Sequence, residues 1–196
     1  MKKVISVLLA LSLCLSVGMA LATNAETGEV NGVKDGAITV YDGVQYKQIA
    51  AGEALHGAKA GTEAKAAVAA LLTGLAADTN VKSFKIAGVD AKAMDVLKDE
   101  SADVKVSAIL TFLGFFKADE QADDVKAAVA KLKDAGISAT EAPATAITFE
   151  GKDAELRTIT IEVEGKDGAK TYERYNFVRI VGETEWKLVT ISNSVQ

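Results

Sequence analysis

Apolar side chains recur at helical spacing through the first two thirds of the chain. The i, i+3, i+4, i+7 spacing of one buried helix stripe is met by Val68, Leu71, Leu72 and Leu75. Thr62 precedes this stripe and is of a type that caps helix N-termini, so a helix is predicted from Thr62 to about Ala76. The capping residue and the apolar stripe agree on a helix, and the stripe places one face of this helix in the core.

A second amphipathic helix is predicted from Asp119 to about Ala135. Its buried stripe consists of Val125, Val129 and Leu132. Acidic residues at its start favour the helix dipole, and Gly136 suits the position after its end. Between the two helices, residues 81–88 are predicted as a strand and residues 91–98 as a short helix.

Residues 104–116 form the most apolar stretch of the chain after its N-terminal segment. Their periodicity fits both a buried helix and a central strand. We favour a helix, and a strand remains the alternative. In such a helix, the side chains that face the core would be those of Ile109, Phe112, Leu113 and Phe116.

The last third of the chain alternates between apolar and polar positions, as strands with one buried face do. Short turns rich in Gly and Asp separate the predicted strands at 145–150, 155–164, 171–181 and 185–192. Short turns join antiparallel neighbours, so these strands form a meander. Residues 37–49 add a hairpin around Asp42–Gly43, a pair that favours a type I′ turn. The predicted fold class is therefore α+β, with N-terminal helices and a short β-hairpin packed on a four-stranded antiparallel meander.

Arg179 interrupts the apolar face of the meander. Alternation places it with Tyr175, Phe177 and Val181, and a four-residue turn at 182–185 would set it opposite Leu188. A guanidinium on an apolar face needs a partner. Arg179 is therefore either an anion-binding residue at the mouth of a pocket between sheet and helices, an ion-pair partner of Glu155, or a side chain that reaches over the sheet edge. We consider an ion pair or an edge position the stronger interpretation.

Arg157 raises the same question on the preceding strand. The candidate ligand-binding residues are accordingly Arg179, Arg157 and Tyr175. No catalytic or metal-ligating set is predicted and no cofactor is expected, because the chain lacks a phosphate-binding loop and has one histidine. That histidine, His56, is predicted to be exposed and inert in a loop or weak helix at 50–61.

The closing segment resembles the C-terminal half of the nuclear-transport-factor-2-like (ketosteroid-isomerase-like) superfamily. The matching features are Tyr172, Tyr175, Phe177, Val178, the turn Gly182–Glu183–Thr184, and then Trp186–Lys187–Leu188. The resemblance covers residues 145–192. It implies a curved sheet wrapped on helices, with a cone-shaped cavity that some members use for catalysis and others for binding. It carries no catalytic residue over to this chain.

Residues 1–22 have the layout of a cleaved secretory signal peptide, with two lysines, an apolar run and the motif Ala20-Leu21-Ala22. A retained membrane anchor is the alternative, since the apolar run from Val4 to Ala22 has 19 residues, which is long enough to span a bilayer core. Cys14 follows the bulky Leu13, which disfavours lipid attachment, so the cysteine is expected to be lost with the signal. The remaining chain divides into a flexible leader at 23–36 and a single α+β domain at 37–196.

The charge balance narrows the class of partner. Without residues 1–22 the chain has 20 basic and 27 acidic residues, so nucleic acid binding is not expected. We expect an exported bacterial protein, secreted or in the cell envelope, that binds a small ligand or a protein partner without catalysis. A second copy of the chain is one such partner, and a membrane is contacted only if the signal is retained. The alternative is a small hydrolase- or isomerase-like enzyme that uses carboxylates in a helix–sheet cavity.

Overall fold

Four consecutive antiparallel strands form the centre of the fold, as the alternation predicts. They are β9 (Thr145–Phe149), β10 (Lys152–Gly165), β11 (Lys170–Ile180) and β12 (Lys187–Ser194). The computed structural model describes the chain apart from residues 1–22, 25–28, 31–32, 88, 139–143 and 196. The predicted signal peptide lies outside the described residues.

The sheet is larger than the predicted meander. Its strand order is β4-β5-β12-β11-β10-β8, and β9 pairs with the first residues of β10, on the same edge as β8. The added strands are β4 (Ile38–Tyr41), β5 (Val44–Gln48) and β8 (Val81–Ile86). The predicted hairpin around Asp42–Gly43 is present, but it extends the sheet as an edge. The four-stranded meander is therefore corrected to seven strands, because the outer edges of β12 and β10 have backbone groups that need partners.

Register decides which side chains face the helices. The loop 165–169 sets Ile159 opposite Tyr175, which keeps the apolar residues of β10 and β11 on one face. Between β11 and β12 a bulge shifts the pairing, so that Phe177 lies opposite Leu188. The predicted pairing of Arg179 with Leu188 is wrong, because β11 ends at Ile180 and six residues separate it from β12.

The bulge also exchanges two side chains in β12. Strict alternation from Leu188 would place Thr190 on the helix side, but it lies on the outer face, where Nδ2 of Asn176 donates a 2.6 Å hydrogen bond to its Oγ1. Ile191 instead pairs with Tyr175 and joins the core. One extra residue in a strand moves every later side chain to the opposite face of the sheet. The alternation of apolar and polar residues in the sequence does not reveal such a bulge.

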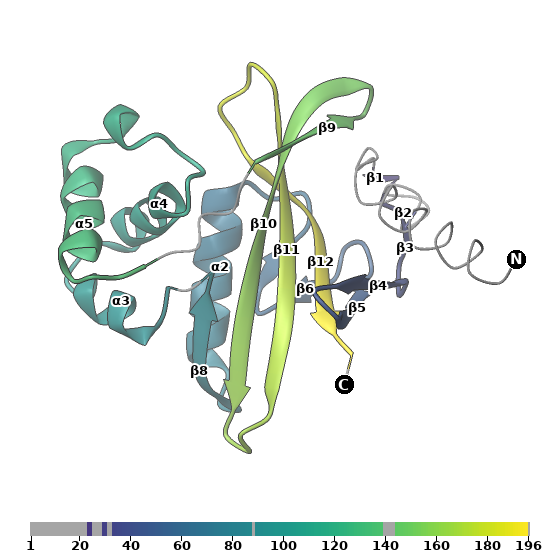
Figure 1. Ribbon diagram of the computed structural model, residues 1–196, viewed down its shortest axis with the longest axis horizontal. Helices are drawn as coiled ribbons and strands as arrows, with labels where there is room; N and C mark the ends of the chain where they lie inside the picture. The colour runs from purple at the N-terminus through teal and green to yellow at the C-terminus, as the bar shows by residue number, and fades with distance from the viewer. Residues whose placement is uncertain (1–22, 25–28, 31–32, 88, 139–143, 196) are drawn as a thin grey trace, which may run out of the picture.

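The helices lie on one side of the sheet (Figure 1). They are α2 (Ala64–Ala77), α3 (Ala91–Val96), α4 (Ala102–Phe112) and α5 (Asp123–Asp134), with a 3₁₀ turn, η1, at Ala118–Glu120. Figure 1 shows α2 behind the long strands and the other three helices gathered beside it. Most of the apolar stretch 104–116 belongs to helix α4, so the prediction of a helix there is confirmed and the alternative of a strand is wrong. Its Ser101 accepts a capping hydrogen bond from the Val104 backbone.

Two predicted helix starts are wrong. Helix α2 has Glu63 at its N-cap, and the hydroxyl of Thr62 instead donates to the carbonyl of Lys59 in the preceding turn. Helix α5 begins at Asp123, because the residues around Asp119 close the separate 3₁₀ turn. Local capping preferences of Thr and Asp apply equally to turns, so sequence alone does not assign them.

The core fills the space between the helices and the inner face of the sheet. Its largest fully buried side chains include Trp186, Tyr175, Phe115 and Phe177. The ring of Phe115 meets those of Phe177 and Trp186 edge-on, each at a centroid distance of 5.2 Å. A smaller apolar cluster on the outer face consists of Ile147, Ala154, Val178 and Val189.

Residues 50–61 form a hairpin where a loop or weak helix was expected. Strands β6 (Ala54–Leu55) and β7 (Ala58–Lys59) are joined by His56–Gly57, whose φ angles of 48° and 81° are those of a type I′ turn. The backbone of this turn rests on Gly74 of α2. A Cβ at Gly74 would lie 2.1 Å from the His56 carbonyl oxygen, so only glycine permits this contact.

The segment predicted as a flexible leader contains three short strands among its described residues. They are β1 (Thr23–Asn24), β2 (Glu29–Val30) and β3 (Val33–Lys34), which pair in that order as a small antiparallel sheet. The division into leader and domain stays a prediction. In the part of the chain that the structure describes, no helix is both long and apolar enough to cross a membrane.

Candidate functional site

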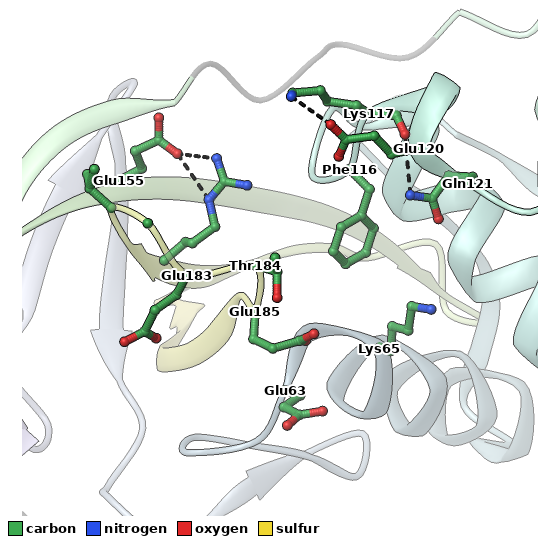
Figure 2. A pocket seen from close by; sticks show the side chains of 13 residues that line it. Glu63, Lys65, Phe116, Lys117, Glu120, Gln121, Glu155, Glu183, Thr184 and Glu185 are labelled. Carbon is green, nitrogen blue, oxygen red and sulfur yellow. Dashed lines mark hydrogen bonds and ion pairs between the residues drawn. The ribbon is translucent and has the colours of Figure 1, made fainter.

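A pocket of about 650 Å³ opens where the helices meet one end of the sheet. Four segments distant in sequence form its wall: the start of α2, the connection after α4, Glu155 in β10, and the end of β11 with the following loop. In Figure 2, Phe116, Lys65 and Glu185 come from three of these segments and point toward the same space. Tertiary structure thus brings together residues that no sequence motif connects.

Arg179 lies at this pocket and is ion-paired with Glu155. Its Nη2 and Nε donate to Oε2 of Glu155 at 2.5 Å and 3.2 Å. Its guanidinium also lies 4.8 Å from the ring centroid of Trp186. Of the interpretations made from sequence, the ion pair with Glu155 is found, at the mouth of a pocket. The pair fixes the guanidinium against the pocket wall and neutralises most of its charge.

The other two candidate residues lie behind the pocket wall. The guanidinium of Arg157 lies 5.8 Å from the Phe115 ring and 5.5 Å from the Trp186 ring, which places it in the aromatic core. Tyr175 is fully buried, and burial raises the pKa of its hydroxyl far above the usual range. Neither residue lines the pocket, so the three sequence candidates do not converge on one site.

A buried polar cluster was missed by the sequence analysis. Glu173 is 2% exposed on the helix side of β11, and its Oε2 accepts a 2.7 Å hydrogen bond from the Tyr175 hydroxyl. Its Oε1 lies 2.8 Å from Nε2 of His56, and Oδ2 of Asp78 lies 4.0 Å from the opposite ring nitrogen. The prediction that His56 is exposed and inert is therefore wrong. Its side chain is 13% exposed and is held by a carboxylate.

A signal for Glu173 was present in the sequence. Alternation places Glu173 on the same face as Tyr175 and Phe177, so it interrupts the apolar face in the same way as Arg179. Its partner His56 comes from a turn 117 residues earlier. That pairing depends on the fold, and no local spacing indicates it.

The electrostatics of the pocket are dominated by carboxylates. Its acidic residues are Glu63, Glu120, Glu155, Glu183 and Glu185, and its basic residues are Lys65, Lys117 and Arg179. Two of the bases are already paired within the wall, Arg179 with Glu155 and Lys117 with Glu120 at 2.7 Å. The hydrogen bond from Lys117 to Glu120 raises the pKa of that lysine.

The remaining charged residues of the pocket lining are not ion-paired with one another. Lys65 lies 5.7 Å from the centroid of the Phe116 ring, as in a cation–π contact. The carboxylates of Glu63, Glu183 and Glu185 form no ion pair among the described residues. Three unpaired carboxylates and one unpaired lysine leave the pocket net negative, so it attracts cations and repels anions.

A second pocket of about 360 Å³ lies on the outer face of the sheet, over the smaller apolar cluster. Phe149, Val178, Ile180 and Val189 contribute to its apolar wall. Glu183 and Glu185 line both pockets, so the loop between β11 and β12 separates them. No group of three or more metal-binding side chains gathers among the described residues.

Comparison with known proteins adds no family to this picture. No family model, curated protein or solved structure matches the chain. The resemblance of residues 145–192 to the nuclear-transport-factor-2-like superfamily is therefore without support and remains a prediction. The site has to be interpreted from its own geometry.

Proposed function

We propose that this protein is an exported bacterial domain that binds a small polar ligand without transforming it. The pocket beside Arg179 carries the proposal. It measures about 650 Å³, which is within the range of small-molecule sites, and it is assembled from four separate segments. Export is inferred from the layout of residues 1–22.

The charges of the pocket suggest the kind of ligand. Because Arg179 is neutralised by Glu155, it is a poor receptor for a free anion, contrary to the first interpretation of this residue. The unpaired carboxylates favour a neutral polar or cationic ligand instead. The Phe116 ring offers a surface for an apolar part or a cationic group of that ligand.

The arrangement of the buried acid supports binding over catalysis. Both oxygens of Glu173 are occupied, one by His56 and one by Tyr175. A general acid or base must reach a substrate proton, and Glu173 lines neither of the two pockets described above. The buried Glu173 is therefore not available at these pockets as the acid of the carboxylate enzyme considered from sequence.

Native mass spectrometry of the protein isolated from its own host tests the proposal. We expect a retained small-molecule adduct that is lost in the double variant Glu183→Gln/Glu185→Gln and kept in the control Glu53→Gln, an exposed carboxylate outside the pocket. Retention of a protein partner with no small-molecule adduct would contradict the proposal. So would an adduct that survives the double variant unchanged.

A further inference from the structure

Arg174 on the outer face of the sheet lies flat against tyrosine side chains of the β4–β5 hairpin. Its guanidinium carbon is 3.7 Å from the ring centroid of Tyr41 and 5.5 Å from that of Tyr46. The strand order explains the contact, because β11 pairs with β12 and β12 with β5. In register, Arg174 lies opposite Ser192, and Ser192 lies opposite Gln48. The hairpin thus brings its aromatic face over the arginine.

This arginine differs from the other two in the chain. Arg179 is paired with Glu155, and Arg157 has a further partner beside its two aromatic contacts. Among the residues that the structure describes, Arg174 has neither an ion pair nor a hydrogen bond from its guanidinium. Asp42 in the hairpin turn acts on it only through space. Its positive charge is therefore left without a counter-charge in direct contact.

The guanidinium is partly desolvated as well. Its Nε is buried and makes no hydrogen bond, whereas its terminal nitrogens are not among the buried unpaired atoms and so reach solvent. Burial is also the main cause that lowers the pKa of Arg174. A charged group that is half removed from water and unpaired is costly, and stacking on tyrosine offsets only part of this cost. The guanidinium is thus stacked on a tyrosine ring, and its terminal nitrogens have no hydrogen-bond partner among the described residues.

Polar side chains two residues further along the outer face from Arg174 are engaged with one another. Thr158 donates to Asn176 at 2.7 Å, and Asn176 donates to Thr190 at 2.6 Å. These three side chains bond to one another, and none of them makes a hydrogen bond to the arginine. Tyr41 is 44% exposed at the edge of the same surface.

We propose that Arg174 and Tyr41 form a second binding site, on the outer face, which receives the oxyanion of an acidic ligand. A planar guanidinium with a free edge matches the geometry of a carboxylate or phosphate group, which it binds through two parallel N–H donors. Stacking on Tyr41 positions the fork before the ligand arrives. The site is independent of the pocket beside Arg179, which lies on the helix side of the sheet and has the opposite charge preference.

The alternative is that the stack serves only to attach the hairpin to the sheet. The two roles make different predictions for a lysine at this position. Lysine keeps the charge but loses the planar fork, so Arg174→Lys should abolish most oxyanion binding. A purely structural role would leave no saturable anion binding to lose.

The three arginines of the chain make a direct measurement possible. The side-chain Nε–Hε groups give three NMR signals, and each is assigned by its glutamine variant. The native protein is titrated with sodium acetate and, separately, sodium phosphate, with chloride replaced to keep ionic strength constant. We expect a saturable shift of the Arg174 signal alone. Phosphate acting without acetate would identify a phosphate-bearing ligand, and the reverse would identify a carboxylate.

Two variants complete the test. Arg174→Lys removes the Arg174 signal, so its titration is followed through the ring signals of Tyr41. This variant should weaken binding at least about tenfold, which corresponds to ~1.4 kcal/mol. Lys47→Gln removes one positive charge from the same hairpin but from its other face, so it should leave the titration unchanged. The proposal is overturned if neither anion gives a saturable shift of the Arg174 signal. It is also overturned if all three arginine signals move together, or if Arg174→Lys binds as tightly as the native protein.

Discussion

The carboxylate of Glu173 lies 2.8 Å from Nε2 of His56, although the two residues are 117 positions apart. Glu173 is buried on the sheet, and His56 sits at the tip of the β6–β7 hairpin. The contact therefore joins the hairpin to the centre of the core. It also gives the only histidine of the chain a defined protonation behaviour.

The stability contributed by His56 should depend on pH. The hydrogen bond to Glu173 raises the pKa of His56 above its ordinary value, against the opposing effect of burial. A raised pKa means that protonation favours the folded state. The stabilisation is thus complete below the unfolded value of about 6.5 and is lost as pH rises through the folded pKa.

The variant His56→Asn tests this, because asparagine also tolerates the positive φ of 48°. Near pH 5.5, above the titration of ordinary carboxyls, we expect it to lower the free energy of unfolding by about 1.5–3 kcal/mol. The loss should be smaller near pH 9. Denaturant unfolding at both pH values measures the difference, and an equal loss at both would contradict the linkage.

Gly74→Ala should destabilise the protein even though alanine favours helices. In an exposed helix interior this change stabilises by about 1 kcal/mol. Here the added Cβ would lie 2.1 Å from the His56 carbonyl oxygen, so we expect a net loss of about 1–3 kcal/mol. The single histidine gives a second readout, since displacement of the hairpin should return the pKa of His56 toward its ordinary value. The neighbouring exposed Thr73→Ala is the control, expected to change stability by no more than about 0.5 kcal/mol.

Two adjacent phenylalanines should differ sharply in their effect on stability. Phe115 is 1% exposed, contacts the rings of Phe177 and Trp186, and accepts the indole hydrogen bond of Trp186 through its backbone. Phe115→Ala should cost about 3–5 kcal/mol. Phe116 is half-buried at the pocket, so its alanine variant should cost clearly less. Fluorescence of the one tryptophan follows both unfolding transitions, and equal losses would contradict the assigned burial.

The ion pair between Arg179 and Glu155 should contribute little to stability. About a third of each side chain is exposed, at 31% and 35%, so solvent screens the interaction. A double-mutant cycle with Arg179→Ala and Glu155→Ala should give a coupling of about 0.2–1 kcal/mol that decreases in high salt. A coupling of several kcal/mol that does not change with salt would contradict this expectation, because it would mean that solvent does not screen the pair.

Much of the secondary structure follows from local pattern, because periodicity of apolar residues reports directly on which face is buried. The stripe from Val68 to Leu75 and the strands after residue 144 are found close to where they were predicted. Element ends were less accurate. Thr62 uses its hydroxyl in the turn before α2 and not as a helix cap, and Asp119 lies within the separate 3₁₀ turn η1.

The candidate site was only partly foreseeable. Arg179 and its partner Glu155 could be paired from sequence, because they lie on the same face of adjacent strands joined by a short loop. The Glu173–His56 pair and the Arg174–Tyr41 stack could not. Each joins the meander to a hairpin more than a hundred residues earlier, and the sequence does not state where those hairpins dock.

By itself the sequence determined the fold class, the order of most elements and the face of β10 and β11 that is buried. These depend on interactions between residues close in the chain, where alternation and helical spacing are decisive. The tertiary structure decided the seven-stranded sheet, the bulge that reverses β12, and the pocket walled by four segments. Those features arise when distant backbone edges and side chains satisfy one another, and the free energy of such contacts exists only once the chain has folded.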